Sequence, residues 1–337
     1  MMRAPVRQAA WRRATGILLA AAGLTAATGI ARAAESDAAA AWPARPIRLI
    51  ASVSAGTSLD TLARLTATRL AAALGQNVVV ENRAGASGNI ASEAVARAAP
   101  DGHTLLFTSN SIATLPAFMG ARAVDPVAAL APVSIVASQP MMIVAHPGFP
   151  GVGFAAMAGA AKGKPGVVPY ATSGVGSLAH LTAVWALSRA GIDMLHVPYS
   201  AAQSFKDVLT GQVPFAFTFF GTALPLVRSG QLKAIAVTSR ERAAVAPEIA
   251  SLHESGLPDF ESLNWQGVLA PAGTPPQVVA RLHAELARMG NDADFEARLR
   301  AMGFTPVFNT PAEFADEIRR ETARWAGIVK AAGLKIE

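Results

Sequence analysis

The sequence predicts an α/β fold in two lobes, each a mainly parallel sheet flanked by helices. Strand and helix patterns alternate from residue 46 onward in two successive sets, and one further strand and several helices follow. Strands joined through helices pair in parallel, because the helix carries the chain back to the starting end of the sheet. Two sets of such units therefore predict two sheets and two lobes.

The first set contains three strands and two helices. Short apolar runs that end at turn residues predict the strands, and apolar side chains at helical spacing predict the helices. The expected order is strand 46–53, helix 58–75, strand 77–81, helix 88–99 and strand 103–109. Gly75 suits the left-handed position that follows a helix.

The second set begins near Met142 and repeats the alternation. Its strands are expected at 141–147, 166–173, 193–199, 212–219 and 232–239, and its helices at 153–162, 177–190, 200–210 and just after 219. A last strand is expected at 263–273. Thr274-Pro275-Pro276-Gln277 and Thr310-Pro311-Ala312-Glu313 both have the pattern of a capping box that begins a helix.

We place the first lobe at residues 42–141 and 266–337 and the second at 142–265. Two strands, near 139–145 and 263–269, would then cross between the lobes as hinges. Ligands of open parallel sheets bind beyond the carboxyl ends of the strands. The loops expected to form the rim of a cleft are 54–58, 82–88, 109–112, 171–177, 199–201 and 218–222.

The first 33 residues have the pattern of a secretory signal peptide. Four arginines precede a short apolar stretch from Gly16, and Ala31-Arg32-Ala33 supplies a small-residue cleavage site. We expect cleavage after about Ala33 and a periplasmic protein. Arg12-Arg13 leaves the twin-arginine export route open beside the general one.

Net charge gives no support to nucleic-acid binding. Residues 1–33 hold five arginines and no acidic residue, so 24 of the 29 basic side chains remain after cleavage against 23 acidic ones, a net charge of +1. The chain has no cysteine, which excludes disulfides, thiolate metal ligands and a cysteine nucleophile.

The rim loops are short, uncharged and rich in hydroxyl and backbone N–H donors. Loops 54–58 and 171–177 each lead directly into a helix, whose N-terminus attracts anions through unsatisfied N–H groups and the helix dipole. Two such termini facing one cleft would bind a carboxylate with neutral groups alone. Each loop taken singly fits an ordinary helix cap equally well.

Other site chemistries find little support. Residues 174–179 match a loose dinucleotide-binding pattern, but the pattern recurs at 151–156, and an exported protein meets little nicotinamide cofactor. No G-x-S-x-G turn offers a serine nucleophile, His180 lies one turn beyond Ser177, and the six histidines show no metal-ligand spacing. We expect no cofactor, metal, catalytic residue or enzymatic activity.

Several stretches in the right order resemble the Bug-type receptors of the tripartite tricarboxylate transporter (TctC-like) family. They include WPARPIRLIASVSAGTSLDTLAR, LGQNVVVENRAGASGNIASEAVARAAPDGHTLLF, YATSGVGSLAHL and HVPYSAAQSFKDVLTGQV. The resemblance implies a two-lobed periplasmic binding protein fold, type II-like, that closes on a small organic carboxylate. It also implies that the partner is a membrane permease of a tripartite transporter. We expect the receptor itself to be a monomer. The alternative is a periplasmic sensor that uses the same cleft.

The rim loops and the resemblance together give the expected ligand-binding residues. They are Ser54, Ala55, Gly56, Thr57, Ser58, Ser109, Asn110, Thr172, Ser173, Gly174, Gly176, Ser177, His180, Tyr199, Ser200, Thr218 and Phe219. Thr57 stands where the family usually has a second glycine. Thr218 stands where it commonly has an aspartate, which argues against an amino-acid ligand. A phenylalanine of the run 215–220 that faced the cleft would favour an apolar or aromatic acid.

Overall fold

The computed structural model describes residues 42–199 and 206–334. The expected signal peptide, its cleavage site at Ala33 and the rim residue Ser200 lie outside the described residues. Residues 46–337 cluster as one compact unit. The boundaries of the two lobes within it remain a prediction.

The first group of strands follows the predicted order. β1 (Ile47–Ala51) pairs in parallel with β2 (Val78–Asn82) on one side and with β3 (Thr104–Ser109) on the other. α2 (Ser58–Leu74) and α3 (Asn89–Ala96) are the helices between these strands, and Gly75 closes α2 in the left-handed conformation. β3 then pairs antiparallel with β9 (Leu263–Pro271).

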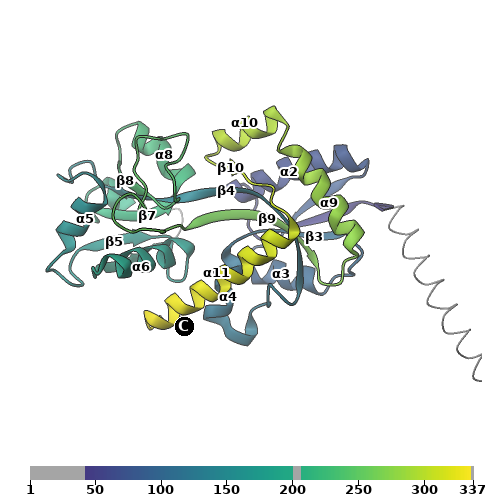
Figure 1. Cartoon of the computed structure of the whole chain (residues 1–337), viewed down its shortest axis with the longest axis horizontal. Coiled ribbons are helices and arrows are strands. Elements are labelled where there is room, and N and C mark those ends of the chain that lie inside the picture. Colours follow the sequence, from purple (N-terminus) through teal and green to yellow (C-terminus); the bar gives the residue numbers. More distant parts are fainter. Residues whose placement is uncertain (1–41, 200–205, 335–337) are drawn as a thin grey trace, which may run out of the picture. The chain divides into compact units, whose positions relative to one another are not determined.

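β4 (Leu130–Ala145) is much longer than the predicted strand at 141–147. Residues 130–140 pair antiparallel with β9, whereas residues 141–145 pair with β7 (Phe215–Phe219) and β8 (Lys233–Val237). β4 therefore belongs to both groups of strands (Figure 1), as expected for a crossing strand. The first half of β4 was not predicted, because Pro132 and Pro140 interrupt the sequence pattern that is typical of a strand.

The second group of strands contains β5 (Pro169–Thr172), which pairs in parallel with β6 (Leu195–Pro198) and with β7. The strand order through both groups is β2-β1-β3-β9-β4-β7-β5-β6. The helices of this group are α5 (Gly153–Ala161), α6 (Leu178–Ala190), α7 (Lys206–Leu209) and α8 (Phe220–Arg228). Within the described residues these elements confirm the predicted α/β alternation.

One helix was not predicted. α4 (Ser111–Met119) begins where the sequence suggested only the rim loop 109–112, and a short 3₁₀ turn, η2 (Gly120–Arg122), extends it. Pro116 lies inside α4 and removes one backbone donor, which is why the segment lacks the sequence pattern of a helix. α4 therefore supplies part of the rim in place of a loop.

The C-terminal elements are α9 (Pro276–Met289), α10 (Ala293–Ala301), β10 (Thr305–Pro306) and α11 (Pro311–Ala331). The capping box at Thr310 is confirmed, because its hydroxyl accepts from Glu313 N–H and the Glu313 carboxylate accepts from Thr310 N–H. The box expected at Thr274 is wrong. The N-cap of α9 is Pro275, and the Thr274 hydroxyl donates instead to the Pro271 carbonyl.

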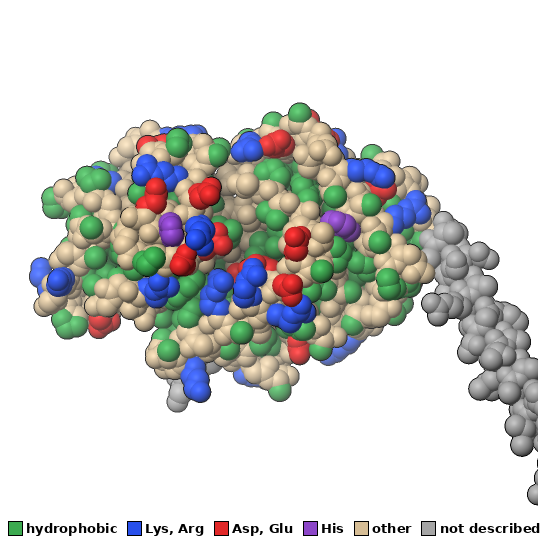
Figure 2. Space-filling model, in the orientation of Figure 1, with side chains coloured by type: hydrophobic (Ala, Val, Ile, Leu, Met, Phe, Trp, Pro, Cys, Tyr) green, Lys and Arg blue, Asp and Glu red, His purple; other side chains and the backbone are tan. Residues whose placement is uncertain are grey.

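α11 packs on both groups of strands. Phe314 and Ile318 lie in a cluster with Trp265 of β9, whereas Trp325 lies in a cluster with Phe217 of β7. The face that α11 crosses in Figure 1 carries acidic and basic side chains side by side in Figure 2. No helix in residues 42–199 and 206–334 combines the length and apolar character needed to cross a membrane.

Candidate ligand-binding site

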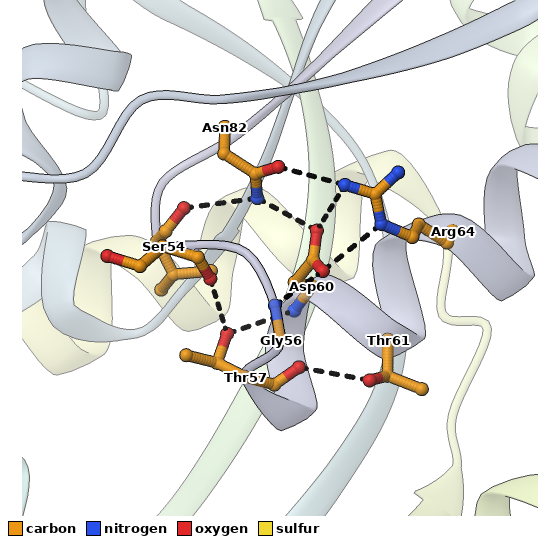
Figure 3. A network of polar contacts seen from close by, with 8 residues as sticks. Ser54, Gly56, Thr57, Asp60, Thr61, Arg64 and Asn82 are labelled. Atoms are coloured by element: carbon orange, nitrogen blue, oxygen red, sulfur yellow. Dashed lines mark hydrogen bonds and ion pairs between the residues drawn. The ribbon is translucent and has the colours of Figure 1, made fainter.

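The first predicted rim loop, Ser54–Ser58, forms a sharp, exposed corner between β1 and α2 (Figure 3). Thr57 is the N-cap of α2, where its hydroxyl accepts from Asp60 N–H at 3.3 Å and donates to the Ser54 carbonyl at 3.1 Å. Gly56 N–H donates to the Asp60 carboxylate at 2.9 Å. The corner is thus held by Asp60, the third residue of α2, whose carboxylate accepts a hydrogen bond from the loop that precedes the helix.

Asp60 is a buried structural anion in this corner. Arg64 forms an ion pair with it, and the Asn82 amide donates to it at 2.8 Å. Burial raises the pKa of Asp60, but hydrogen bonds from Arg64, Gly56 and Asn82 outweigh burial and hold the pKa below its usual range. Asp60 is therefore a carboxylate at neutral pH with its partners fixed, which suits positioning of the loop and not acid–base chemistry.

The second predicted rim loop, 171–177, forms a matching corner between β5 and α6. Ser177 is the N-cap of α6 and accepts from His180 N–H at 3.2 Å, and Gly176 N–H donates to Nδ1 of His180 at 3.1 Å. The Ser177 hydroxyl donates to the Gly174 carbonyl at 2.7 Å. Gly174 has φ of 115° and Gly176 has φ of 74°, values that favour glycine.

His180 is buried against His196 of β6, with the ring centroids 3.8 Å apart and the planes nearly parallel. Burial lowers the pKa of His180 to about 4, and burial together with His180 lowers the pKa of His196 to about 4. Both rings are therefore neutral at pH 7. Because Nδ1 of His180 accepts from Gly176, its proton is on Nε2.

The two corners share one arrangement. In each, a glycine N–H donates to the side chain four residues later, and a Thr or Ser N-cap accepts from the backbone of that later residue. The first N–H groups of a helix have no partner inside the helix. Among the described residues, no hydrogen bond uses the N–H groups of Ser58 and Leu59 or of Leu178 and Ala179.

A pocket of about 370 Å³ opens beside the first corner. Its ten lining residues carry no charge, and six of them carry a hydroxyl: Ser52, Ser54, Thr57, Ser87, Ser109 and Ser111. The structure thus brings together three predicted residues, Ser54, Thr57 and Ser109. Sequence reasoning missed Ser52, Ser87 and Ser111, although Ser87 and Ser111 lie in loops that were singled out as rim.

A third loop, Gly85–Gly88, lines this pocket and was not among the predicted site residues. All four residues have positive φ, including Ala86 at 45° and Ser87 at 53°. Non-glycine residues rarely adopt this conformation, which costs on the order of 1–2 kcal/mol per residue. The sequence signal was the pair of glycines at 85 and 88, since both hold φ values that favour glycine.

A second pocket of about 300 Å³ lies between this third loop and the second corner. Ala86 and Ser87 line one part of it, and Val175 and the predicted residue Gly176 line another. Ser87 lines both pockets. The first predicted corner therefore borders one pocket, and the second corner borders the other.

The remaining predicted residues take other positions. Asn110 is buried and donates to the Leu263 carbonyl, and Thr172 is buried with its hydroxyl 2.7 Å from Nε2 of His196.

Tyr199 donates its hydroxyl to Asp207, and this hydrogen bond together with burial raises the Tyr199 pKa to about 12. Thr218 is buried in β7 and Phe219 is half-buried at its end, and neither lines the two pockets described here. The assignment of these residues to the site stays a prediction.

These pockets have the chemistry of a binding site. Hydroxyl groups and helix N-termini recognise an anion, and the ionisable side chains at the corners, Asp60 and His180, are held in one protonation state by their partners. Within the described residues, no group of three or more histidine and acidic side chains could hold a metal ion. The fold is that of the periplasmic solute-binding proteins.

Comparison with known proteins gives the particular family. Residues 62–334 match the model of the tripartite tricarboxylate transporter family receptor, and the chain belongs to that family. Protein BugT of Bordetella pertussis is 35% identical over 324 residues, which cover 95% of this chain and 98% of BugT.

Solved structures of similar proteins agree with the fold. An R. palustris protein solved with adipate has a TM-score of 0.76 and 30% identity, covering 87% of this chain and 99% of its own. The periplasmic binding protein BugD has a TM-score of 0.73 and 31% identity, over 88% of this chain and 100% of its own. MatC from Rhodopseudomonas palustris, solved with bound malate, has a TM-score of 0.72 and 29% identity, over 86% and 100%.

Proposed function

We propose that this protein is an extracytoplasmic receptor that captures a small carboxylate and presents it to the permease of a tripartite transporter. The observation that carries the proposal is the uncharged, hydroxyl-lined pocket beside the N-terminus of α2. A carboxylate there accepts hydrogen bonds from neutral donors. It is also stabilised by the positive end of the α2 helix dipole. Each hydrogen bond to a charged group contributes about 1.5–3 kcal/mol, so a few of them support micromolar binding.

The same proposal covers localisation and assembly. Residues 1–33 have the pattern of a signal peptide, so the receptor is exported and cleaved after about Ala33 to act in the periplasm. It works as a monomer without a cofactor or an enzymatic reaction of its own. Contacts of one ligand with both corners favour a closed state, which a permease can distinguish from the open one.

A thermal-shift screen of carboxylic acids at neutral pH tests the ligand class. Binding to the folded state alone raises the melting temperature, so a genuine ligand should raise it in a concentration-dependent way. We expect mono- and dicarboxylates to do so and α-amino acids not to, because the ten residues that line the hydroxyl-rich pocket include no acidic side chain to pair with an ammonium group. Stabilisation by amino acids alone would refute this expectation.

Gly174→Ala tests the second corner. Its φ of 115° lies outside the region that alanine tolerates, so alanine strains loop 171–177, although its Cβ would make only an ordinary contact 3.4 Å from the Tyr199 carbonyl. We expect affinity for the best carboxylate of the screen, measured by calorimetry, to fall at least about tenfold while the fold persists.

Gly191→Ala is the matched control. Gly191 ends α6 with φ of 65° and open space around its Cβ position, so alanine there costs about 1 kcal/mol of stability without disturbing the corner. Equal loss of affinity in the two variants, or no loss in either, would remove loop 171–177 from the site.

A further inference from the structure

The N-terminus of α8 contacts the turn between α10 and β10 through backbone atoms. A Cβ atom built on Gly221 would lie 2.6 Å from the carbonyl oxygen of Met302, and one built on Gly303 would lie 2.8 Å from the Cα atom of Gly221. Real Cβ atoms essentially never approach another heavy atom closer than 3.0 Å. The two backbones therefore approach each other as closely as glycine alone allows.

This contact joins the two lobes of the fold. α8 follows β7 in the second group of strands, where Phe220 is fully buried in a cluster with Met142 and Ala216. β10 pairs with residues 137–138 of β4, in the part of β4 that pairs with β9, so β10 belongs to the first group. The two sides of the contact therefore belong to different lobes, which move relative to each other when a hinge between them bends.

The contact lies beside the point where β4 passes from one lobe to the other. Residues 130–140 of β4 pair with β9, and residues 141–145 pair with β7 and β8. Gln139 lies next to this junction and is 4% exposed, and its Oε1 accepts a hydrogen bond from Gly221 N–H at 3.1 Å. The crossing strand itself therefore holds Gly221 against the other lobe.

We propose that the contact of Gly221 with Met302 and Gly303 is a pivot contact that fixes the angle between the two lobes. Packed segments do not deform continuously, so a small displacement at such a contact becomes a larger rotation of the parts that it joins. A methyl group on Gly221 has to move by about 0.8 Å to reach an ordinary distance of 3.4 Å from the Met302 oxygen. The contact is present without a ligand, so its effect can be measured on the unliganded protein.

Double electron–electron resonance between spin labels in the two lobes tests the proposal. The chain has no cysteine, so Ala72→Cys on α2 and Ala155→Cys on α5 place one label in each lobe, both at exposed positions. Every variant carries this labelled pair, and no ligand is added. We expect Gly221→Ala and Gly303→Ala to change the mean label separation by about 2 Å or more, both in the same direction, because both methyl groups enter the same contact.

Two matched controls separate the contact from other effects of the substitutions. Gly303 has φ of 80°, and Gly230, just after α8, has φ of 73° with no atom within 4 Å of its Cβ position, so Gly230→Ala has similar backbone strain without the contact. Gly159 lies inside α5, as Gly221 lies inside α8, and its Cβ position is also open. Gly230→Ala and Gly159→Ala should keep the label separation of the labelled parent protein.

A third variant keeps both glycines, in case a methyl group at either one prevents folding. Gln139→Met removes the acceptor of Gly221 N–H, and it should broaden the distribution of label separations because Gly221 is held less firmly. Unchanged separations in Gly221→Ala and Gly303→Ala, shifts in opposite directions, or an unchanged distribution in Gln139→Met would overturn the pivot contact. The carboxylate receptor would still stand, because it is tested by binding of carboxylic acids.

Discussion

At the scale of single residues, the stacked histidines show how an ionisable group can serve a site without reacting. His180 and His196 lie with ring centroids 3.8 Å apart, and a positive charge on either ring would face the other inside the protein. Burial is the main reason that both have a pKa of about 4. Their neutrality lets Nδ1 of His180 accept from Gly176 and thereby hold the second corner.

This neutrality predicts acid sensitivity. The His180 pKa is about 4 in the folded protein and 6.5 ordinarily, so the unfolded state binds more protons between these values. The stabilisation is complete above pH 6.5 and is lost as pH falls toward 4. His180→Asn keeps an acceptor for Gly176, and it should reduce the loss of unfolding free energy between pH 7 and pH 4.5 by roughly 1–2 kcal/mol, measured by urea denaturation.

A control separates this pair from histidines in general. His253→Asn replaces a half-buried histidine far along the chain whose Nδ1 also accepts a backbone N–H, that of Asp259. Its pH profile is measured as the reference for loss of a histidine outside the stacked pair. A His180→Asn profile that coincides with wild type would show that the buried pair does not titrate as inferred.

At the scale of elements, the caps of α2 and α6 have a double role. Thr57 and Ser177 stabilise their helices and also hold the two rim loops, because their hydroxyls donate to the carbonyls of Ser54 and Gly174. Thr310 caps α11 with the same hydroxyl chemistry, although it lines neither pocket. Replacing a hydroxyl N-cap by alanine costs about 1 kcal/mol of stability in proteins.

The three caps therefore give a matched experiment. Thr57→Ala, Ser177→Ala and Thr310→Ala should each lower the unfolding free energy of the unliganded protein by about 1 kcal/mol. Only the first two should also weaken carboxylate binding, by about threefold to tenfold, because they loosen the corners. Calorimetry measures the affinities, and a Thr310→Ala variant that binds as weakly as the other two would show that the effect comes from global stability.

Elements whose own residues carry a clear pattern could be predicted from the sequence. α2, with apolar residues at helical spacing and Gly75 at its end, is found within one residue of its predicted range. The first half of β4 and the whole of α4 could not be predicted, because Pro132, Pro140 and Pro116 lie inside them. Tertiary pairing with β9 and packing by α11 stabilise these segments, and neither is visible in a local pattern.

Some residues of the candidate site could likewise be predicted from the sequence, and others could not. The corners were predictable because each follows a strand and begins a helix with Thr57 or Ser177 as cap. Ser111 was not, since its place depends on α4, and Ser52 was not, since it was assigned to a strand. Whether a side chain lines a pocket depends on elements far away in the sequence.

At the scale of the whole molecule, α11 packs on both groups of strands and carries a buried carboxyl group. Glu321 is 2% exposed, and the indole N–H of Trp265 in β9 donates to it at 2.9 Å. Burial first, and then the nearby Glu317 carboxylate, raise the Glu321 pKa to about 8, while Trp265, Arg324 and Asn110 offset this only in part. Glu321 is therefore mainly protonated at neutral pH, next to the crossing strand β4 and β9.

The sign of the resulting pH dependence is opposite to that of the histidines. The folded state binds the proton more tightly than the unfolded state, whose Glu pKa is near 4.5, so the stabilisation is complete below pH 4.5 and is lost as pH rises through about 8.

Glu321→Gln keeps an acceptor for Trp265 and carries no charge at any pH. Between pH 5 and pH 9 the variant should lose less unfolding free energy than wild type, by on the order of 2 kcal/mol. Asp316→Asn, an exposed neighbour on α11 that pairs with Arg319, is measured as a reference for loss of an acidic group on the same helix. Equal slopes for wild type and Glu321→Gln would mean that Glu321 does not hold its proton.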